Sequence, residues 1–291
     1  MKALSVFSGK GGTGKTTLVA CFARLAPSSV VIDCDVDAAN LALIVAGKDV
    51  CCEPFSAGQK AKVQPAKCDQ CGACQEACRF GAVIKTSKGF RIDPLQCEGC
   101  GVCALVCPRD AVSFSPNQVG QWMVRQVNPP DNQNWLVHAA LKVGQDNSGK
   151  LVAKIKEVGE KLAIEARIEL LLVDGPPGIG CPVHAAFAKT DAILAVAEPT
   201  VSGEHDLLRL LDLARHFNVK AMVAINKWDL CAAKTESIET LARERNVPIV
   251  GRIPFDPSIP RMLAQRRLPL EEPASKNTVL AIKEVWKAFV G

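Results

Sequence analysis

The sequence predicts an α/β protein: a doubly wound parallel sheet with a small inserted α+β module. Two observations support this prediction. Short, nearly continuous apolar runs alternate with helical patterns along most of the chain, which is typical of parallel strands covered on both faces by crossover helices. In addition, eight of the 14 cysteines fall within the 40 residues from Cys68 to Cys107. We therefore expect a discontinuous main domain, residues 1–57 and 117–291, around an inserted module at 58–116.

The expected elements follow from these patterns in chain order. Apolar runs predict strands at residues 3–7, 30–32, 170–173, 192–197, 222–225 and 249–253. Helical periodicity predicts helices at residues 15–25, 148–166, 204–217, 237–245 and 278–290. Residues 117–147 have the pattern of a strand, a loop at 128–132 and a second strand, which would return the chain from the module to the main domain.

Composition narrows the class of protein. Of the 291 residues, 48% are hydrophobic and 22% are charged, which excludes disordered, collagen-like and coiled-coil proteins. The net charge of +5 is too small to indicate a nucleic-acid partner. No apolar stretch reaches the roughly 18 residues of a membrane span, and no signal-peptide pattern precedes Ser8. A cytoplasmic location is expected, where clustered cysteines bind metal instead of forming disulfides.

A glycine-rich loop separates the first expected strand from the first expected helix. It matches the pattern G-x-x-x-x-G-K-[ST], whose backbone N–H groups cradle phosphates at the start of a helix. Lys15 is expected to reach the β- and γ-phosphates, and the hydroxyl of Thr16 to bind Mg²⁺. The chain is therefore expected to hydrolyse a nucleoside triphosphate. The residues of this predicted loop site are Gly9, Lys10, Gly11, Gly12, Thr13, Gly14, Lys15, Thr16 and Thr17.

An additional lysine at position 10 gives the loop the form Lys-Gly-Gly-x-Gly-Lys-Thr-Thr. This form resembles the deviant Walker A loop of the MinD/Mrp/ParA family of P-loop ATPases, which includes the nitrogenase iron protein. The resemblance implies that Lys10 reaches across a nucleotide-dependent dimer to the partner's phosphates. It also implies that Asp35 orients the attacking water and that Asp174 lies near Mg²⁺. A helix N-cap is the alternative role for Asp174. The dimer would be a homodimer or a heterodimer with a paralogous ATPase.

Two patterns bear on the base of the nucleotide. Residues 226–229 spell the N-K-x-D sequence of GTPases, in which the carboxylate of Asp229 would read guanine. The family resemblance implies instead that Asn226 serves adenine, together with the loop that contains Pro254 and Asp256. ATP is the favoured nucleotide and GTP the alternative; with ATP, Asp229 would only cap the following turn.

The two cysteine runs have the spacing C-x2-C-x2-C-x3-C and repeat 29 residues apart. This is the spacing of a bacterial ferredoxin with two [4Fe-4S] clusters, in which the fourth cysteine of each run ligates the other cluster. Zinc is the alternative, although zinc sites usually pair two C-x2-C units at longer separation. The expected ligands are Cys68, Cys71, Cys74 and Cys107 for cluster I, and Cys97, Cys100, Cys103 and Cys78 for cluster II.

The complete chain resembles MinD-superfamily ATPases that carry an inserted ferredoxin domain. The favoured function couples nucleotide-dependent dimerisation to electron transfer through the two clusters. The alternatives are an ATP-dependent assembly or carrier protein for iron–sulfur or metal cofactors, and a MinD-like spatial regulator. The C-terminal half has only Cys181 and Cys231 in place of the C-x2-C pair of such carriers, which favours electron transfer.

Hydrolysis is expected to be slow without a partner, and a redox protein or a cofactor client is the expected partner. No membrane contact is expected, because packing against the sheet explains the apolar stripe of the helix at 278–290.

Overall fold

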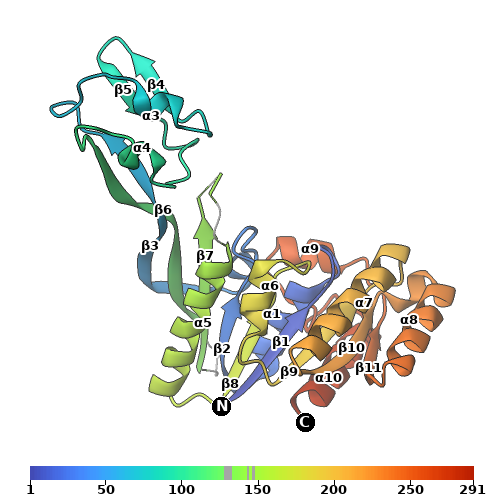
Figure 1. Ribbon diagram of the computed structural model, residues 1–291. Coiled ribbons are helices and arrows are strands. Elements are labelled where there is room, and N and C mark those ends of the chain that lie inside the picture. Colours follow the sequence, from blue (N-terminus) through green and yellow to red (C-terminus); the bar gives the residue numbers. More distant parts are fainter. Residues whose placement is uncertain (128–132, 143, 146–147) are drawn as a thin grey trace. The chain divides into compact units, whose positions relative to one another are not determined.

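The computed structural model describes residues 1–127, 133–142, 144–145 and 148–291. The predicted loop at 128–132 lies outside the described residues. The chain divides into two units (Figure 1), and the predicted module at 58–116 falls inside the second of them. The first unit comprises Met1–Glu53, Gln121–Leu141 and Ser148–Gly291, and the second comprises Pro54–Gly120 and Lys142–Asn147.

A large sheet forms the centre of the first unit. Its strands are β1 (Lys2–Phe7), β2 (Ser28–Asp33), β3 (Gly47–Val63), β6 (Val112–Val127), β7 (Gln133–Leu141), β8 (Leu170–Asp174), β9 (Ala192–Ala197), β10 (Lys220–Asn226) and β11 (Ile249–Ile253). Their order is β11-β10-β9-β1-β8-β2-β7-β6-β3. Neighbouring strands from β11 to β7 pair in parallel, so the predicted parallel α/β fold is confirmed. Since parallel strands end at the same edge, this sheet gathers the residues that follow β1, β2, β8, β9 and β10.

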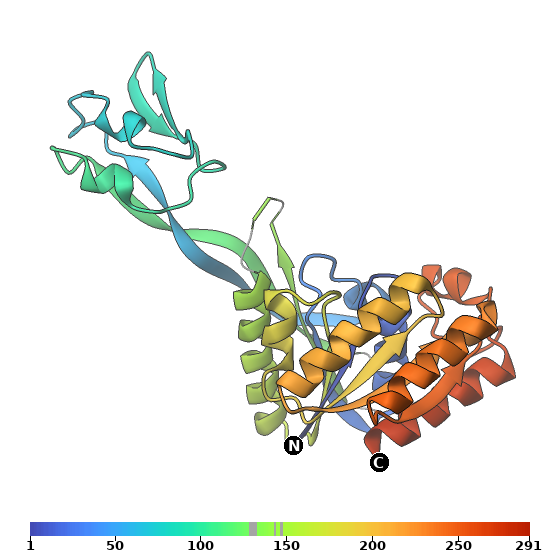
Figure 2. The same ribbon diagram turned by 45° about the vertical axis from the view of Figure 1, so that its right-hand side comes forward.

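Helices cover both faces of this sheet, as Figure 2 shows. Helices α1 (Lys15–Leu25) and α10 (Lys276–Val290) share one apolar cluster with the sheet, in which the rings of Phe22 and Trp286 stack at 5.2 Å. Burying a side chain such as Phe22 contributes about 2 kcal/mol. The remaining helices of this unit are α2 (Leu41–Ile44), α5 (Ser148–Glu165), α6 (Cys181–Phe187), α7 (Val201–His216), the short η1 (Trp228–Leu230), α8 (Ala232–Glu244) and α9 (Ile259–Ala264).

The outer strands β3 and β6 differ from the sequence prediction. β3 extends over 17 residues and β6 over 16, and both continue from the first unit into the second. Most side chains of β3 are exposed or half-buried, so no apolar run marks this strand in the sequence. Among the described residues, no helix has the length and apolar character needed to cross a membrane.

The second unit repeats one backbone motif. Its helices are α3 (Ala73–Glu76) and α4 (Val102–Leu105), and its antiparallel hairpin pairs β4 (Val83–Thr86) with β5 (Gly89–Ile92). Positive φ angles recur at the 29-residue offset of the cysteine runs, so the duplication in the sequence is also a duplication of backbone conformation. The matching pairs are Gln70 with Gly99, Gly72 with Gly101, and Gly81 with Asp110.

Candidate functional site

The glycine-rich loop connects β1 to α1, and two of its glycines are required by close contacts. Gly14 has φ +89°, and a Cβ there would lie 2.4 Å from Nδ2 of Asn226. A Cβ on Gly9 would lie 2.0 Å from Cβ of Asp206 on α7. No side chain caps the start of α1, so its first N–H groups are available to an anion.

A cavity of about 730 Å³ opens beside this loop. The loop from Lys10 to Thr17 forms one wall, and the segment with Asp35, Asp37 and Asn40 forms another. Of the predicted loop residues, Gly9 does not line this cavity and instead faces α7. The rest of the cavity is lined by Asn226, by Lys227 and by an apolar group. The members of this group are Leu18, Ile253, Pro254, Phe255, Ile259 and Leu263. The cavity therefore offers a cationic phosphate end and an apolar end suited to a base.

Lys15 and Asp174 form an ion pair beneath the loop, with side chains that are 6% and 0% exposed. Lys15 Nζ also donates to Oγ1 of Thr16 at 3.3 Å. The other carboxylate oxygen of Asp174 is buried without a hydrogen-bond partner. The N-cap alternative for Asp174 is wrong, because α6 begins after Gly180. Lys15 thus contacts both Thr16 and Asp174, and the hydroxyl and carboxylate oxygens of these two residues are the kind of ligand that Mg²⁺ prefers.

Asp33 is a buried acid that the sequence analysis did not assign to the site. It lies directly opposite Asp174 in the β2–β8 register. Burial, and then the charge of Asp174, raise the pKa of Asp33 to about 8. Its carboxylate accepts the N–H groups of Asp35 at 3.1 Å and of Leu41 at 3.2 Å. The available signal was an acid at the end of a buried strand, as at Asp174, which the family resemblance identified.

Asp35 occupies the turn after β2, half-buried at the cavity wall. Burial raises the pKa of its carboxyl, the positive charge of Lys15 opposes that rise, and Asp174 adds to it. The carboxyl therefore faces the same part of the cavity as the loop lysine. This placement is compatible with the predicted orientation of a water molecule, which remains a prediction.

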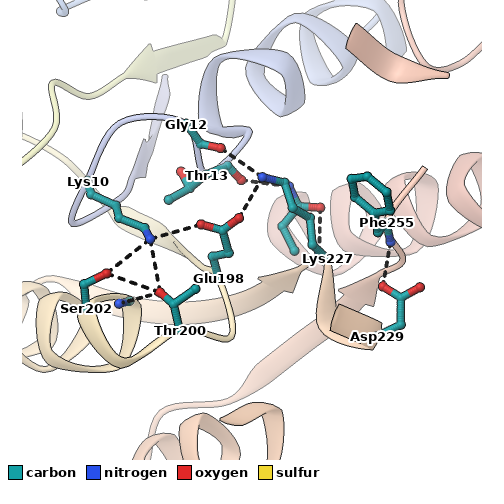
Figure 3. A network of polar contacts seen from close by, with 11 residues as sticks. Lys10, Gly12, Thr13, Glu198, Thr200, Ser202, Lys227, Asp229 and Phe255 are labelled. Carbon is teal, nitrogen blue, oxygen red and sulfur yellow. Dashed lines mark hydrogen bonds and ion pairs between the residues drawn. The ribbon is translucent and has the colours of Figure 1, made fainter. Parts of the chain in front are cut away.

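Lys10 contacts residues of its own chain (Figure 3). Its Nζ lies 3.2 Å from Oε2 of Glu198, 3.1 Å from the hydroxyl of Thr200 and 3.2 Å from that of Ser202. The other oxygen of Glu198 pairs with Lys227 at 2.7 Å, and Lys227 also donates to the carbonyl of Gly12. Burial alone would raise the pKa of Glu198, but the two lysines hold it below its usual value. The sequence analysis missed Glu198, although it follows β9 at the edge where β1 ends.

The base end of the cavity is held by internal hydrogen bonds. Asn226 donates to the carbonyl of Thr13 at 2.7 Å and accepts the N–H of Lys227 at 3.1 Å. One carboxylate oxygen of Asp229 accepts the N–H of Phe255 at 2.7 Å (Figure 3). This carboxylate therefore braces the loop beside the apolar lining, in place of the turn-capping role considered for it.

The two predicted contacts in that loop differ in their placement. Pro254 lines the cavity directly. Asp256 lines it too, but its oxygens accept hydrogen bonds from Ser258 at 2.6 Å and from the N–H of Ser275 at 2.8 Å. Burial alone would raise the pKa of Asp256, and these hydrogen bonds lower it to about 2. Its carboxylate therefore orders the loop.

The eight repeated cysteines form two groups within the second unit. Burial raises the pKa of the Cys74 thiol, and the neighbouring thiols of Cys68, Cys107 and Cys71 raise it further. A small cavity is lined by the other four, Cys78, Cys97, Cys100 and Cys103. The assignment of these cysteines to two clusters remains a prediction from their spacing. Backbone N–H groups also point to sulfur atoms, from Gly99 to Cys97 at 3.4 Å and from Ala111 to Cys107 at 3.2 Å.

Within the described part of the chain, no three or more His, Cys, Asp or Glu side chains converge on a position for one metal ion. In a cubane each thiolate binds a different iron atom, so its four ligands stand farther apart than the ligands of a single ion. The structure therefore does not itself establish a metal site, and both the predicted clusters and the zinc alternative remain predictions.

Comparisons with known proteins agree with this geometry. The family model described as the CobQ/CobB/MinD/ParA nucleotide binding domain matches residues 4–270. The uncharacterized protein MJ0578 of Methanocaldococcus jannaschii is 32% identical, over 98% of this chain and 95% of its own length. The iron-sulfur cluster carrier protein of Rickettsia typhi is 26% identical over 95 residues, which are 32% of this chain and 29% of the carrier.

Among solved structures, the septum site-determining protein MinD from Pyrococcus horikoshii, in complex with Mg-ADP, has a similar fold. Its TM-score is 0.58 at 15% sequence identity, covering 99% of this chain and 95% of that protein. At this identity the likeness concerns the fold alone.

Proposed function

Because the chain belongs to the CobQ/CobB/MinD/ParA family of nucleotide-binding domains, we propose that it hydrolyses Mg-ATP and couples nucleotide-dependent dimerisation to electron transfer through two [4Fe-4S] clusters. The observation that carries this proposal is the grouping of eight cysteines into two sets of four in the same chain as an unblocked phosphate loop. The proposed partner is a redox protein, and the proposed location is the cytoplasm, because clustered cysteines bind metal in a reducing compartment.

The residues of the cavity account for nucleotide binding and hydrolysis. The first N–H groups of α1 and the ammonium of Lys15 bind the phosphates, while Thr16 and Asp174 hold Mg²⁺. Asp35 orients the attacking water, and Lys10 neutralises charge on the partner's phosphates in the dimer. This chemistry consists of positioning and charge neutralisation, so turnover is slow until the dimer brings the second Lys10 into place.

ATP is the proposed nucleotide because the carboxylate of Asp229, which would select guanine, already accepts a hydrogen bond from the protein. An Asp that reads guanine must accept hydrogen bonds from the base, but an oxygen of Asp229 accepts the N–H of Phe255. The apolar side of the cavity provides surfaces for stacking against adenine.

Two features of the second unit support the proposal of two cubanes. It contains the two repeated cysteine runs, and backbone N–H groups donate to the sulfurs of Cys97 and Cys107, which lowers the energy of the thiolate form. When bound, such clusters exchange single electrons with a partner. The thiolates of the eight cysteines hold the iron, and the loops with positive φ angles bring them together.

Cluster ligation can be tested by removing one ligand. After anaerobic reconstitution, the wild type is expected to hold about eight iron atoms per chain, and Cys68→Ala about four, because each cubane contains four. Iron analysis and EPR of the reduced protein measure this, and ATP binding should be unchanged. Cys52→Ala is the matched control, since Cys52 is an exposed cysteine outside both sets. Zinc in place of iron, or equal iron in Cys68→Ala and wild type, would refute the ligand assignment.

Coupling is tested by an EPR-monitored redox titration of the reconstituted protein with and without a non-hydrolysable ATP analogue. We expect the analogue to shift a cluster potential by about 60 mV or more, which is a coupling of about 1.4 kcal/mol per electron. Intact cubane signals without any shift would contradict electron transfer gated by the nucleotide.

A second candidate function is the ATP-dependent carriage of iron–sulfur clusters. The local similarity to the Rickettsia carrier favours it. A carrier must release its cluster, so transfer of iron and sulfide to an apo-ferredoxin within minutes, accelerated by ATP, would support carriage. Retention of both clusters under the same conditions would support electron transfer.

A further inference from the structure

The proposed coupling needs a physical link between the nucleotide cavity and the strands that lead to the cysteines. One polar residue outside the cavity has the contacts for this. Arg125 lies on β6, with only 16% of its side chain exposed. Its guanidinium binds both oxygens of Asp49 on β3, at 2.8 and 3.1 Å. The same group donates to the carbonyls of Ala42 at 2.5 Å and Val45 at 3.2 Å, at the end of α2.

Helix α2 is held at both ends by charged groups. At its start, the N–H of Leu41 donates to the carboxylate of Asp33. Asp33 in turn lies opposite Asp174, the partner of Lys15. At its end, α2 is held by Arg125. A continuous series of polar contacts and adjacent charges therefore runs from the phosphate-loop lysine through α2 to the outer strands.

Strands β3 and β6, where this series of contacts ends, pack closely against each other. A Cβ on Gly47, the first residue of β3, would lie 2.4 Å from the carbonyl oxygen of Gln126 and 2.8 Å from Cγ of Arg125. On β7, the buried ring of His138 contacts Asp49 at 3.2 Å. The hydrogen bonds from Arg125, and then that of His138 and the charge of Arg125, lower the pKa of Asp49 to about 2. Arg125 therefore joins α2 to Asp49 and to the β3–β6 pair through direct contacts.

From these contacts we propose that Arg125 is a positioning residue that transmits the nucleotide state from α2 to the paired strands β3 and β6, which continue into the cysteine unit. The physical reason is that one rigid guanidinium fork binds two elements at once. Lys15 pairs with Asp174, which lies beside Asp33, so a phosphate that draws Lys15 away changes the contacts next to Asp33. Asp33 fixes the start of α2, so this helix is the element that responds. The inference rests on the proposed nucleotide site but does not depend on the clusters.

The test is hydrogen–deuterium exchange of the full chain, read by mass spectrometry with and without a non-hydrolysable ATP analogue and Mg²⁺. In the wild type, the analogue should change exchange in peptides of β3 and β6 by about fivefold or more, the lower range of coupling between sites. In Arg125→Met this difference should disappear while affinity for the analogue stays within about threefold, because Arg125 does not line the cavity.

Two further variants separate coupling from folding. Asp49→Asn keeps the hydrogen bonds from Arg125 to α2 but weakens its contact with β3. The nucleotide-dependent difference in exchange should therefore fall while the protein stays folded. Lys154→Met is the matched control. Lys154 contacts Trp122 on β6, the strand that carries Arg125, and this contact does not involve α2. This variant should retain the full nucleotide-dependent difference in exchange.

Three results would overturn the inference. The first is a wild-type protein that binds the analogue without any change in β3 and β6. The second is an undiminished difference in Arg125→Met and Asp49→Asn. The third is an equal loss in Lys154→Met. Failure of the wild type to bind the analogue would instead refute the proposed nucleotide site, so the two failures are distinguishable.

Discussion

Replacing Lys15 by alanine is expected to weaken ATP binding by at least a hundredfold. The ammonium is the buried cation of the phosphate end, and losing a buried charge partner costs about 3–5 kcal/mol. In the free protein this cation pairs with Asp174, which has a second oxygen without a partner. Titration with a fluorescent ATP analogue measures the loss.

Lys15→Ala should also lower the stability of the free protein, and this effect must be separated from the loss of ATP binding. Without Lys15, Asp174 and Asp33 are two buried carboxylates in register with no cation between them. The double variant Lys15→Ala/Asp174→Asn removes that repulsion, so it should recover thermal stability without recovering ATP binding. Binding restored in the double variant, or retained in Lys15→Ala, would contradict the assignment of Lys15 to the phosphates.

The raised pKa of Asp33 sets the direction in which the free energy of unfolding changes with pH. Its pKa is about 8 in the folded protein, above the ordinary value of an unfolded aspartate, so the folded state binds more protons. Its contribution to the free energy of unfolding is therefore most favourable below about pH 4 and declines as pH rises toward 8. Because the charge of Lys15 lowers this pKa, the decline should continue to higher pH in Lys15→Ala than in the wild type.

Replacing Lys10 by alanine should instead reduce turnover by about a hundredfold or more at saturating ATP, while ATP binding changes by less than about threefold. A charge supplied across an interface to the transferred phosphoryl group is typically worth this much or more. In the structure, Nζ of Lys10 is occupied by Glu198, Thr200 and Ser202, so it is not committed to its own phosphate loop. Steady-state hydrolysis and analytical ultracentrifugation with ATP measure turnover and dimerisation.

The contacts of Lys10 also predict an ordering of events. Lys10 must leave Glu198 before it reaches a partner, and Lys227 remains to neutralise that carboxylate. Lys234→Ala is the control, because Lys234 forms a comparable ion pair with Glu204 on α7, outside the cavity lining. Unchanged turnover in Lys10→Ala at saturating ATP would refute the role of this lysine in the partner's site.

The parts of the site that the sequence could predict are those fixed by short segments. The phosphate loop needs glycines at positions with positive φ, such as Gly12 and Gly14, and a lysine at one position after a buried strand. Cysteine spacing likewise defines two repeated loops, and the backbone angles repeat with them. In each case neighbouring residues along the chain set the geometry, so the pattern is visible before the chain folds.

Other features depend on residues that are far apart in the chain. Asp33 and Asp174 become a pair only because β2 and β8 are neighbours in the sheet. Glu198 meets Lys10 because β9 lies beside β1, and nothing in the local sequence of either residue indicates the other. Sequence patterns also leave Asp229 open to guanine recognition or turn capping, and only the fold shows that its carboxylate accepts the N–H of Phe255.

The sequence by itself thus determined the parallel α/β fold, the phosphate loop and the two cysteine runs, since periodicity and spacing are local properties. Tertiary structure alone decided the partners of the charged groups: Lys15 with Asp174, Lys10 with Glu198, and Arg125 with Asp49. The physical reason is that strand order in the sheet selects which chain segments meet, and a charge acts through the groups that folding places within a few ångströms of it.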